Sequence, residues 1–165
     1  AVRTAAIAHE DLPEILRVVN QTMLVADASA QFCTLVLGRV TTLDGRAEVE
    51  LAVAGHPPPM VLRPGRPATS TTARGDLLGV FPEITTGTQL LHLDAADSLL
   101  VYSDGITESR FGDEQFGWDR LADVATAYAY RDPQLLADAI ITEVESYVGH
   151  RPRDDLPLLV LQADE

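Results

Sequence analysis

One segment of the sequence, residues 99–110, constrains the fold more than any other. It opens with the apolar run Leu99 to Tyr102 and reaches Asp104 and Gly105 two residues later. A continuous apolar run is typical of a buried strand, and a glycine after it lets the backbone turn because it has no Cβ. The segment therefore predicts a buried strand that delivers the carboxylate of Asp104 to the edge of a sheet.

A second pair of acids, Asp154 and Asp155, precedes another apolar run, Leu156 to Leu161. Helical patterns separate the two segments, and a helical pair can return the chain so that both strand ends lie side by side. Carboxylates held together repel, and a divalent cation relieves that repulsion. Because these ligands are all oxygens, Mg²⁺ or Mn²⁺ is favoured over zinc. Taken singly, Asp104-Gly105 is more typical of a turn, and Asp154-Asp155 is more typical of solvated acids in a loop.

The composition is that of an acidic globular protein. The 165 residues include 25 Asp and Glu against 12 Lys and Arg, for a formal net charge of −13. This charge repels phosphate backbones, which argues against a nucleic-acid partner. No apolar run has the length of a membrane span, and the first residues do not resemble a signal peptide. The single cysteine, Cys33, excludes an internal disulfide and a Cys-rich zinc site, and it indicates a cytoplasmic protein.

The hydrophobic pattern predicts an α+β fold. Strands and helices are grouped, which is typical of layers and not of a repeating βα unit. The expected order is a helix at 11–26, about six strands between 32 and 102, two helices that begin near 118 and 133, and a last strand at 156–162.

Three further residues have competing interpretations. Phe116 and Trp118 are expected to anchor a helix in the core. His56 lies in the rigid turn Gly55 to Pro59 and could act as an acid or a metal ligand. We favour a structural role for it, in which the ring forms a hydrogen bond that fixes its loop.

Taken together, several motifs resemble the metal-dependent serine/threonine phosphatases of type 2C (the PPM family), specifically their bacterial SpoIIE/RsbU-like branch. The resemblance extends from near residue 15 to the C-terminus. The matching segments are Arg17-Val18-Val19-Asn20, Phe32-Cys33-Thr34-Leu35, Ala54-Gly55-His56-Pro57-Pro58-Pro59, Leu78-Gly79-Val80-Phe81, Val101-Tyr102-Ser103-Asp104-Gly105-Ile106-Thr107-Glu108, Phe116-Gly117 and Arg153-Asp154-Asp155.

The resemblance implies an α-β-β-α sandwich, with two antiparallel sheets flanked by helices and residues 1–165 forming a single phosphatase domain. It also implies two Mn²⁺ or Mg²⁺ ions that activate a water for in-line attack on a phosphoserine or phosphothreonine, with no protein nucleophile. Asp104 matches the family's Asp-Gly metal ligand, and Gly105 belongs to the backbone of that site. Asp154 matches the C-terminal ligand, and Asp155 is a neighbour that can assist.

The chain departs from the family pattern at its beginning. In the family, a first strand and a Gly-Asp motif upstream of the first helix supply the acid that bridges both metals, and this chain begins at that helix. We therefore expect a domain that lacks its N-terminal strands, has exposed sheet edges, and is weakly active or inactive as these 165 residues alone.

The function implied by the resemblance is hydrolysis of phosphoserine or phosphothreonine on a regulatory protein. The expected substrate is a STAS-type anti-anti-sigma factor. Such a protein would act in bacterial stress or sporulation-type signalling that regulates sigma factors. The alternative is a non-catalytic phosphatase-like module that binds a partner or forms a homodimer. A Gly-Asp motif after an apolar strand, shortly upstream of Ala1, would favour the enzyme, and its absence would favour the module.

Overall fold

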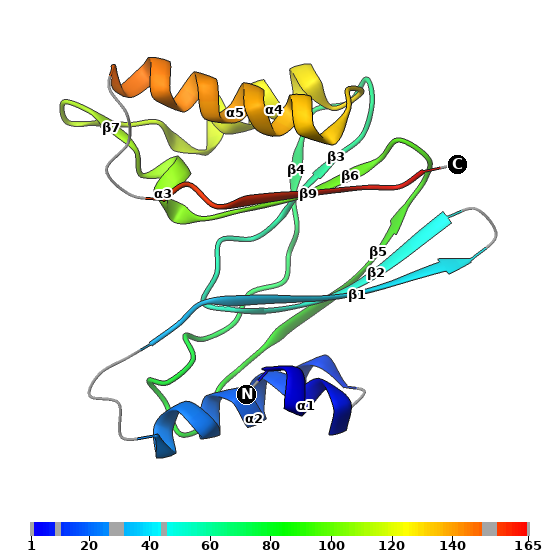
Figure 1. Cartoon of the computed structure of the whole chain (residues 1–165), viewed down its shortest axis with the longest axis vertical. Helices are drawn as coiled ribbons and strands as arrows, with labels where there is room; N and C mark the ends of the chain where they lie inside the picture. The colour runs from blue at the N-terminus through cyan, green and yellow to red at the C-terminus, as the bar shows by residue number, and fades with distance from the viewer. Residues whose placement is uncertain (1, 9–10, 27–31, 44–45, 150–154, 165) are drawn as a thin grey trace. The chain divides into compact units, whose positions relative to one another are not determined.

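The computed structural model describes residues 2–8, 11–26, 32–43, 46–149 and 155–164. The chain divides into two compact units, each with its own sheet and its own helices (Figure 1). The N-terminal unit comprises residues 1–43, 47–58 and 72–92, and the C-terminal unit comprises residues 44–46, 59–71 and 93–165.

The N-terminal unit is a three-stranded sheet with two helices. The strands are β1 (Leu35–Leu43), β2 (Arg46–Ala54) and β5 (Gly87–Leu93), in the order β1-β2-β5, and the helices are α1 (Val2–Ala8) and α2 (Leu12–Val25). The core of this unit joins Leu16 and Val19 of α2 to Ala52, Ala54 and Leu78. The small alanines let the helix lie close to the sheet.

Helix α2 begins where the sequence predicts. The side chain of Asp11 accepts a hydrogen bond from the backbone N–H of Glu14 at 3.0 Å. This satisfies one of the N–H groups that the first helical turn leaves unpaired. Pro13 lies in that first turn, where its missing N–H costs nothing. The carboxylate of Glu14 pairs with the guanidinium of Arg17, which raises the pKa of Arg17 further above its usual range.

The C-terminal unit is a four-stranded antiparallel sheet covered by two long helices (Figure 1). Its core joins residues of β3, β6, α4 and α5, among them Leu62, Leu100, Leu121, Ile140 and Val144. The sheet order is β4 (Thr69–Ser70), β3 (Met60–Leu62), β6 (Ser98–Tyr102) and β9 (Leu158–Gln162), and the helices are α4 (Gly117–Tyr128) and α5 (Pro133–Val148).

The segment between β6 and α4 holds three short elements that the sequence analysis did not predict. They are α3 (Asp104–Thr107), β7 (Arg110–Phe111) and β8 (Glu114–Gln115). The prediction for Trp118 was wrong, because its side chain is 39% exposed in the first turn of α4. Phe116, directly before the helix, is 1% exposed and occupies the core position.

The predicted fold class is confirmed: the protein is α+β, with grouped strands in antiparallel sheets and with helices on both sheets. Within the described residues, none of the helices combines the length and the apolar character needed to cross a membrane.

Candidate metal centre

The predicted delivery of Asp104 by a buried strand is confirmed. Strand β6 buries Ser98, Leu100 and Tyr102, and Asp104 begins α3 two residues after the strand ends. The backbone carbonyl of Asp104 accepts hydrogen bonds from the N–H of Glu108 at 2.7 Å and from the hydroxyl of Thr107 at 3.2 Å. These bonds fix the backbone at Asp104 and leave its carboxylate exposed.

Strand β9 brings the second acidic segment to the same edge of the sheet. Its first residue, Leu158, pairs with Tyr102, the last residue of β6. The ladder continues one step further, where the N–H of Ser103 donates to the carbonyl of Pro157 at 3.1 Å. Because the two strands are antiparallel, the end of β6 meets the beginning of β9, and α4 and α5 form the helical return between them.

Gly105 also lies close to the second segment. A Cβ at this position would lie 3.3 Å from the carbonyl oxygen of Asp155 and 3.4 Å from Oγ of Ser103. A glycine lets these backbones approach without crowding. The carboxylate of Asp155 is exposed, and Asp154, the other predicted ligand of this segment, lies outside the described residues.

The donor groups that the two segments carry are of a kind that suits a hard cation. The Asp104 and Asp155 carboxylates, the Asp155 carbonyl and the Ser103 hydroxyl all contribute oxygen, and Mg²⁺ and Mn²⁺ prefer oxygen ligands. The hydroxyl of Ser103 is buried and has no hydrogen-bond partner among the described residues. In the same part of the chain, no group of three or more His, Cys, Asp and Glu side chains is gathered to hold a metal. A full coordination shell therefore needs ligands beyond Asp104 and Asp155.

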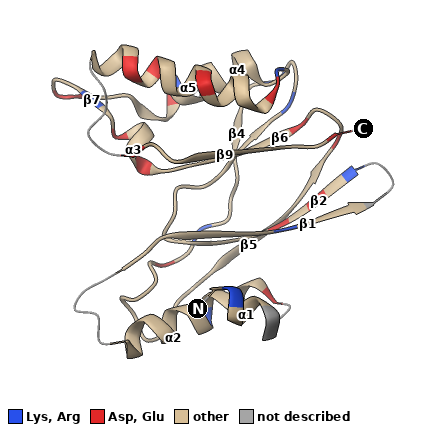
Figure 2. Ribbon diagram, viewed as in Figure 1, with Lys and Arg blue, Asp and Glu red and all other residues tan. Residues whose placement is uncertain are grey.

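The ribbon of α3 carries acidic residues at both of its ends (Figure 2). Glu108 caps α3 one turn after Asp104, so two carboxylates lie on consecutive turns of the same short segment. A divalent cation beside them would relieve the repulsion between like charges.

The structural interpretation of His56 is confirmed. Its Nδ1 lies 2.8 Å from the carbonyl oxygen of Pro57, and because a carbonyl only accepts, Nδ1 carries the proton. Gly55 before it has φ of +63°, and a Cβ there would lie 2.6 Å from the side chain of Leu77. The histidine turn therefore fixes a loop of the N-terminal unit.

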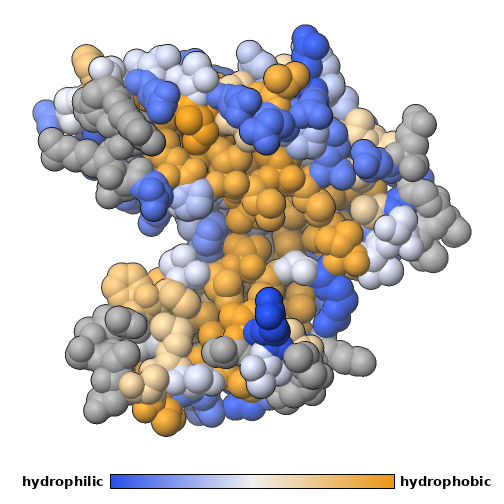
Figure 3. All heavy atoms as spheres, in the orientation of Figure 1, coloured by the Kyte–Doolittle hydropathy of each residue, from blue (hydrophilic) through white to orange (hydrophobic). Residues whose placement is uncertain are grey.

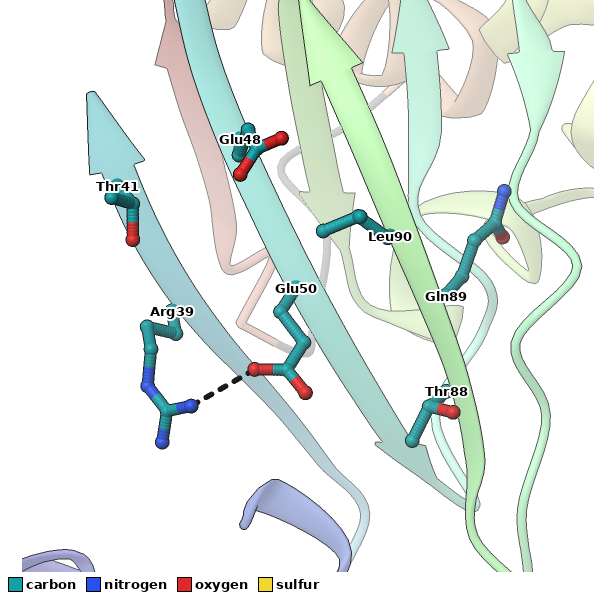
Figure 4. Close-up of a pocket in the computed structure, with 7 residues that line it drawn as sticks. All are labelled: Arg39, Thr41, Glu48, Glu50, Thr88, Gln89 and Leu90. Carbon is teal, nitrogen blue, oxygen red and sulfur yellow. Dashed lines mark hydrogen bonds and ion pairs between the residues drawn. The ribbon is translucent and has the colours of Figure 1, made fainter. Parts of the chain in front are cut away.

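A hollow of about 440 Å³ on the sheet of the N-terminal unit is a second candidate for a polar site (Figure 4). Basic side chains of the chain already lie against its acids. Arg39 pairs with Glu50 at 3.0 Å, and Nδ1 of His92 lies 3.2 Å from Glu48. These pairs make the hollow a poor cation site. The sequence analysis did not predict the contact between His92 and Glu48, because it joins two different strands.

Two motifs behind the family resemblance are joined by a buried amide. Asn20 of α2 is fully buried, its Nδ2 donates to the carbonyl of Phe81 at 2.8 Å, and its Oδ1 accepts from the N–H of Gly79 at 2.7 Å. The sequence analysis assigned Asn20 no role, because nothing local indicates a partner about 60 residues away.

The lone thiol, Cys33, is only partly buried, and its Sγ lies 3.6 Å from the sulfur of Met23. Burial raises the pKa of the Cys33 thiol, which therefore stays protonated and makes a poor nucleophile.

Comparison with known proteins decides the family. Residues 1–164 match the sequence profile described as Stage II sporulation protein E (SpoIIE). The chain belongs to the SpoIIE family. Protein IcfG of Synechocystis sp. is a sequence relative of this SpoIIE-family chain, 27% identical over 134 residues. That match covers 80% of this chain but only 21% of the length of IcfG.

Solved structures have the same fold as this SpoIIE-family chain. The SpoIIE phosphatase domain of Bacillus subtilis, presoaked with Mn, matches with a TM-score of 0.69 and 21% identity, over 99% of this chain and 72% of that one. The RsbU and RsbW domains of a Mycobacterium tuberculosis protein match with a TM-score of 0.73 and 24% identity, over 99% of this chain and 45% of that one. The predicted family and the PP2C phosphatase fold are both confirmed.

Proposed function

We propose that this SpoIIE-family chain is part of a metal-dependent protein phosphatase that hydrolyses phosphoserine or phosphothreonine on a regulatory protein. The observation that carries the proposal is the meeting of Asp104 with the Asp155 segment, where β6 and β9 join in a phosphatase fold. Residues 1–165 are proposed to act as a single domain in this role.

The metal ligands proposed in this chain are Asp104 and Asp154, with Asp155 beside them. Two Mn²⁺ or Mg²⁺ ions bound there would polarise a phosphoryl oxygen and lower the pKa of a water. The contribution of this chain's own residues is to hold the metal-binding groups in place. Backbone hydrogen bonds fix Asp104, and Gly105 admits the Asp155 carbonyl. Ser103 offers a buried hydroxyl that no other described residue engages.

The proposed substrate is a phosphorylated STAS-type anti-anti-sigma factor in bacterial signalling, encountered in the cytoplasm. Support comes from the structural relative that carries RsbU and RsbW domains in one chain. The high negative charge of the molecule suits a protein substrate better than a nucleic acid.

The first test measures Mn²⁺ binding by calorimetry and phosphate release from p-nitrophenyl phosphate, with a chelator control. We expect weak or no release from the 165-residue chain alone, and any release that does occur should be lost when the chelator is added. Asp104→Asn and Asp154→Asn should each weaken Mn²⁺ binding about tenfold or more, because each replaces a charged ligand with a neutral one. Asp123→Asn, at an exposed position of α4, makes the same charge change away from the site and should have no effect. Unchanged Mn²⁺ binding by Asp104→Asn would show that the metal assignment is wrong.

One observation favours the alternative of a non-catalytic module that binds a partner or a second copy. Asp104 and Asp155 lie at the adjoining ends of β6 and β9, and the described residues, which leave out Asp154, hold no group of three or more His, Cys, Asp and Glu side chains. If the wild-type chain neither binds Mn²⁺ nor releases phosphate, the module is supported.

A further inference from the structure

The hairpin β7–β8 is the first structure that follows Asp104 and α3 along the chain. Its register pairs Arg110 with Gln115 and Phe111 with Glu114. A hydrogen bond of 2.7 Å from the Ser109 hydroxyl to the carbonyl of Gly105 ties the hairpin to α3, and a second, from the N–H of Phe116 to the carbonyl of Ser109 at 2.7 Å, closes its base. The position of the hairpin is therefore coupled to that of the candidate metal centre.

Tyr147 of α5 holds the hairpin from the other side. Its hydroxyl donates to the carbonyl of Gln115 at 3.2 Å, and its ring meets Phe116 edge-on at 5.5 Å. The guanidinium of Arg120 stacks 4.7 Å from the centroid of the Tyr147 ring and donates to the carbonyls of Gln115 and Phe116, each at 3.1 Å. A two-stranded hairpin is marginal by itself, so these contacts are what make it a fixed surface.

Strand β7 of the hairpin exposes one cationic and one aromatic side chain, Arg110 and Phe111, and the Phe111 ring also meets the Tyr147 ring edge-on at 6.3 Å. Large exposed apolar side chains occur in both units (Figure 3). Phe111, whose side chain is 64% exposed, is the large exposed apolar residue of the described segment 104–116, which begins at Asp104. The guanidinium of Arg110 donates to the carbonyl of Asp113 at 3.1 Å and forms no ion pair within the described part of the chain. In a molecule with a net charge of −13, an arginine that has no carboxylate partner among the described residues is available to an acidic ligand.

We propose that Arg110 and Phe111 form a docking surface for the protein substrate, next to the site of dephosphorylation. Phe111 would receive an apolar side chain and Arg110 a carboxylate, both from residues that flank the phosphorylated serine or threonine. Aromatic and arginine side chains are enriched where proteins bind one another. This inference rests on the proposed phosphatase function and assigns it a recognition element outside the metal ligands.

The test uses two fluorescein-labelled phosphoserine peptides that differ only in their flanks. One has Leu and Glu on both sides of the phosphoserine, and the other has Ala at those positions. Binding is followed by fluorescence anisotropy with Mn²⁺ present, and phosphate release is measured in parallel with p-nitrophenyl phosphate. Phe111→Ala and Arg110→Gln are compared with two controls, Phe81→Ala and Arg66→Gln, which alter exposed side chains of the same types elsewhere.

We expect the wild-type chain to bind the Leu/Glu peptide about tenfold more tightly than the Ala peptide. Phe111→Ala and Arg110→Gln should each remove most of that preference, while release from p-nitrophenyl phosphate stays within about twofold and both controls behave like wild type. Equal affinity of the wild-type chain for the two peptides, or a preference that survives in both variants, overturns the docking surface. An equal loss with peptide and p-nitrophenyl phosphate also overturns it, because it indicates structural damage to the site.

Failure of the proposed function gives a different result. In that case the wild-type chain releases no phosphate from p-nitrophenyl phosphate, but the anisotropy comparison of the two peptides still decides whether Arg110 and Phe111 bind flanking residues.

Discussion

At the scale of single residues, the protein depends on a few polar groups that satisfy backbone partners far away in sequence. Asn20 is the clearest case, since its one amide group serves both the N–H of Gly79 and the carbonyl of Phe81 from a fully buried position. When a buried polar group loses its hydrogen-bond partner, the free energy of its desolvation is no longer offset, and the folded state is destabilised. The loop 79–81 is therefore held to α2 by an interaction whose removal exposes two backbone groups to that cost.

Asn20→Ala is expected to lower the free energy of unfolding by about 3 kcal/mol, because it leaves a buried donor and a buried acceptor unpaired. Urea denaturation followed by circular dichroism measures the change. Gln21→Ala, on the exposed face of the same helix, should stay within about 0.5 kcal/mol of wild type. Equal stabilities for the two variants would contradict the structural role of Asn20.

At the scale of elements, helix ends are where local sequence and structure agree best. Helix α5 begins at Pro133 after Asp132, whose side chain accepts from the N–H of Gln134 at 2.8 Å, and it ends at Gly149 with φ of +72°. Both ends use residues suited to them: an acid that bonds a free N–H group, and a glycine that adopts the left-handed conformation. The short elements α3, β7 and β8 carry no such signal, because two to four residues do not establish a period.

Asp132→Ala is expected to destabilise the protein by about 1 kcal/mol through loss of the N-cap hydrogen bond. Thermal unfolding followed at 222 nm would show a lower midpoint. Glu143→Ala removes an acid from the exposed face of the same helix and serves as the matched control, with a shift close to zero. If both variants shift the midpoint equally, lost charge and not lost capping is responsible.

At the scale of the whole molecule, the chain forms two units that each have a hydrophobic core. Both cores join segments that are distant in sequence. The core of the N-terminal unit joins α2, β2 and Leu78. The core of the C-terminal unit joins β3 and β6 to the helices α4 and α5. The prediction that residues 1–165 act as one domain requires the two cores to unfold together.

Leu16→Ala tests that cooperativity. Leu16 is fully buried in the N-terminal unit, so its truncation should cost about 3 kcal/mol. The single tryptophan, Trp118, lies in the C-terminal unit and reports on it separately. For one cooperative domain, the fluorescence midpoint of Trp118 in urea falls together with the circular dichroism midpoint. A fluorescence midpoint unchanged from wild type would show that the units unfold independently. Leu135→Ala, at a side chain 54% exposed, is the control.

Part of the candidate site follows from local sequence and part does not. The strand before Asp104 and the meeting of β6 with β9 were predicted, because apolar runs and an intervening helical pair are local patterns. The buried hydroxyl of Ser103, the pair of His92 with Glu48 and the anchoring of the hairpin by Tyr147 were not. Each of these depends on a neighbour from another element, which a one-dimensional pattern does not specify.

The sequence by itself determined the α+β class, the starts of the long helices, and the buried strands β6 and β9 whose ends meet. It could do so because periodicity, helix caps and strand ends are set by residues close together in the chain. The tertiary structure alone decided that Trp118 is exposed while Phe116 is buried, that Gly105 faces the Asp155 carbonyl, and that Phe111 remains in solvent. These outcomes depend on which surfaces the packed elements leave uncovered, and packing is a property of the whole arrangement of side chains.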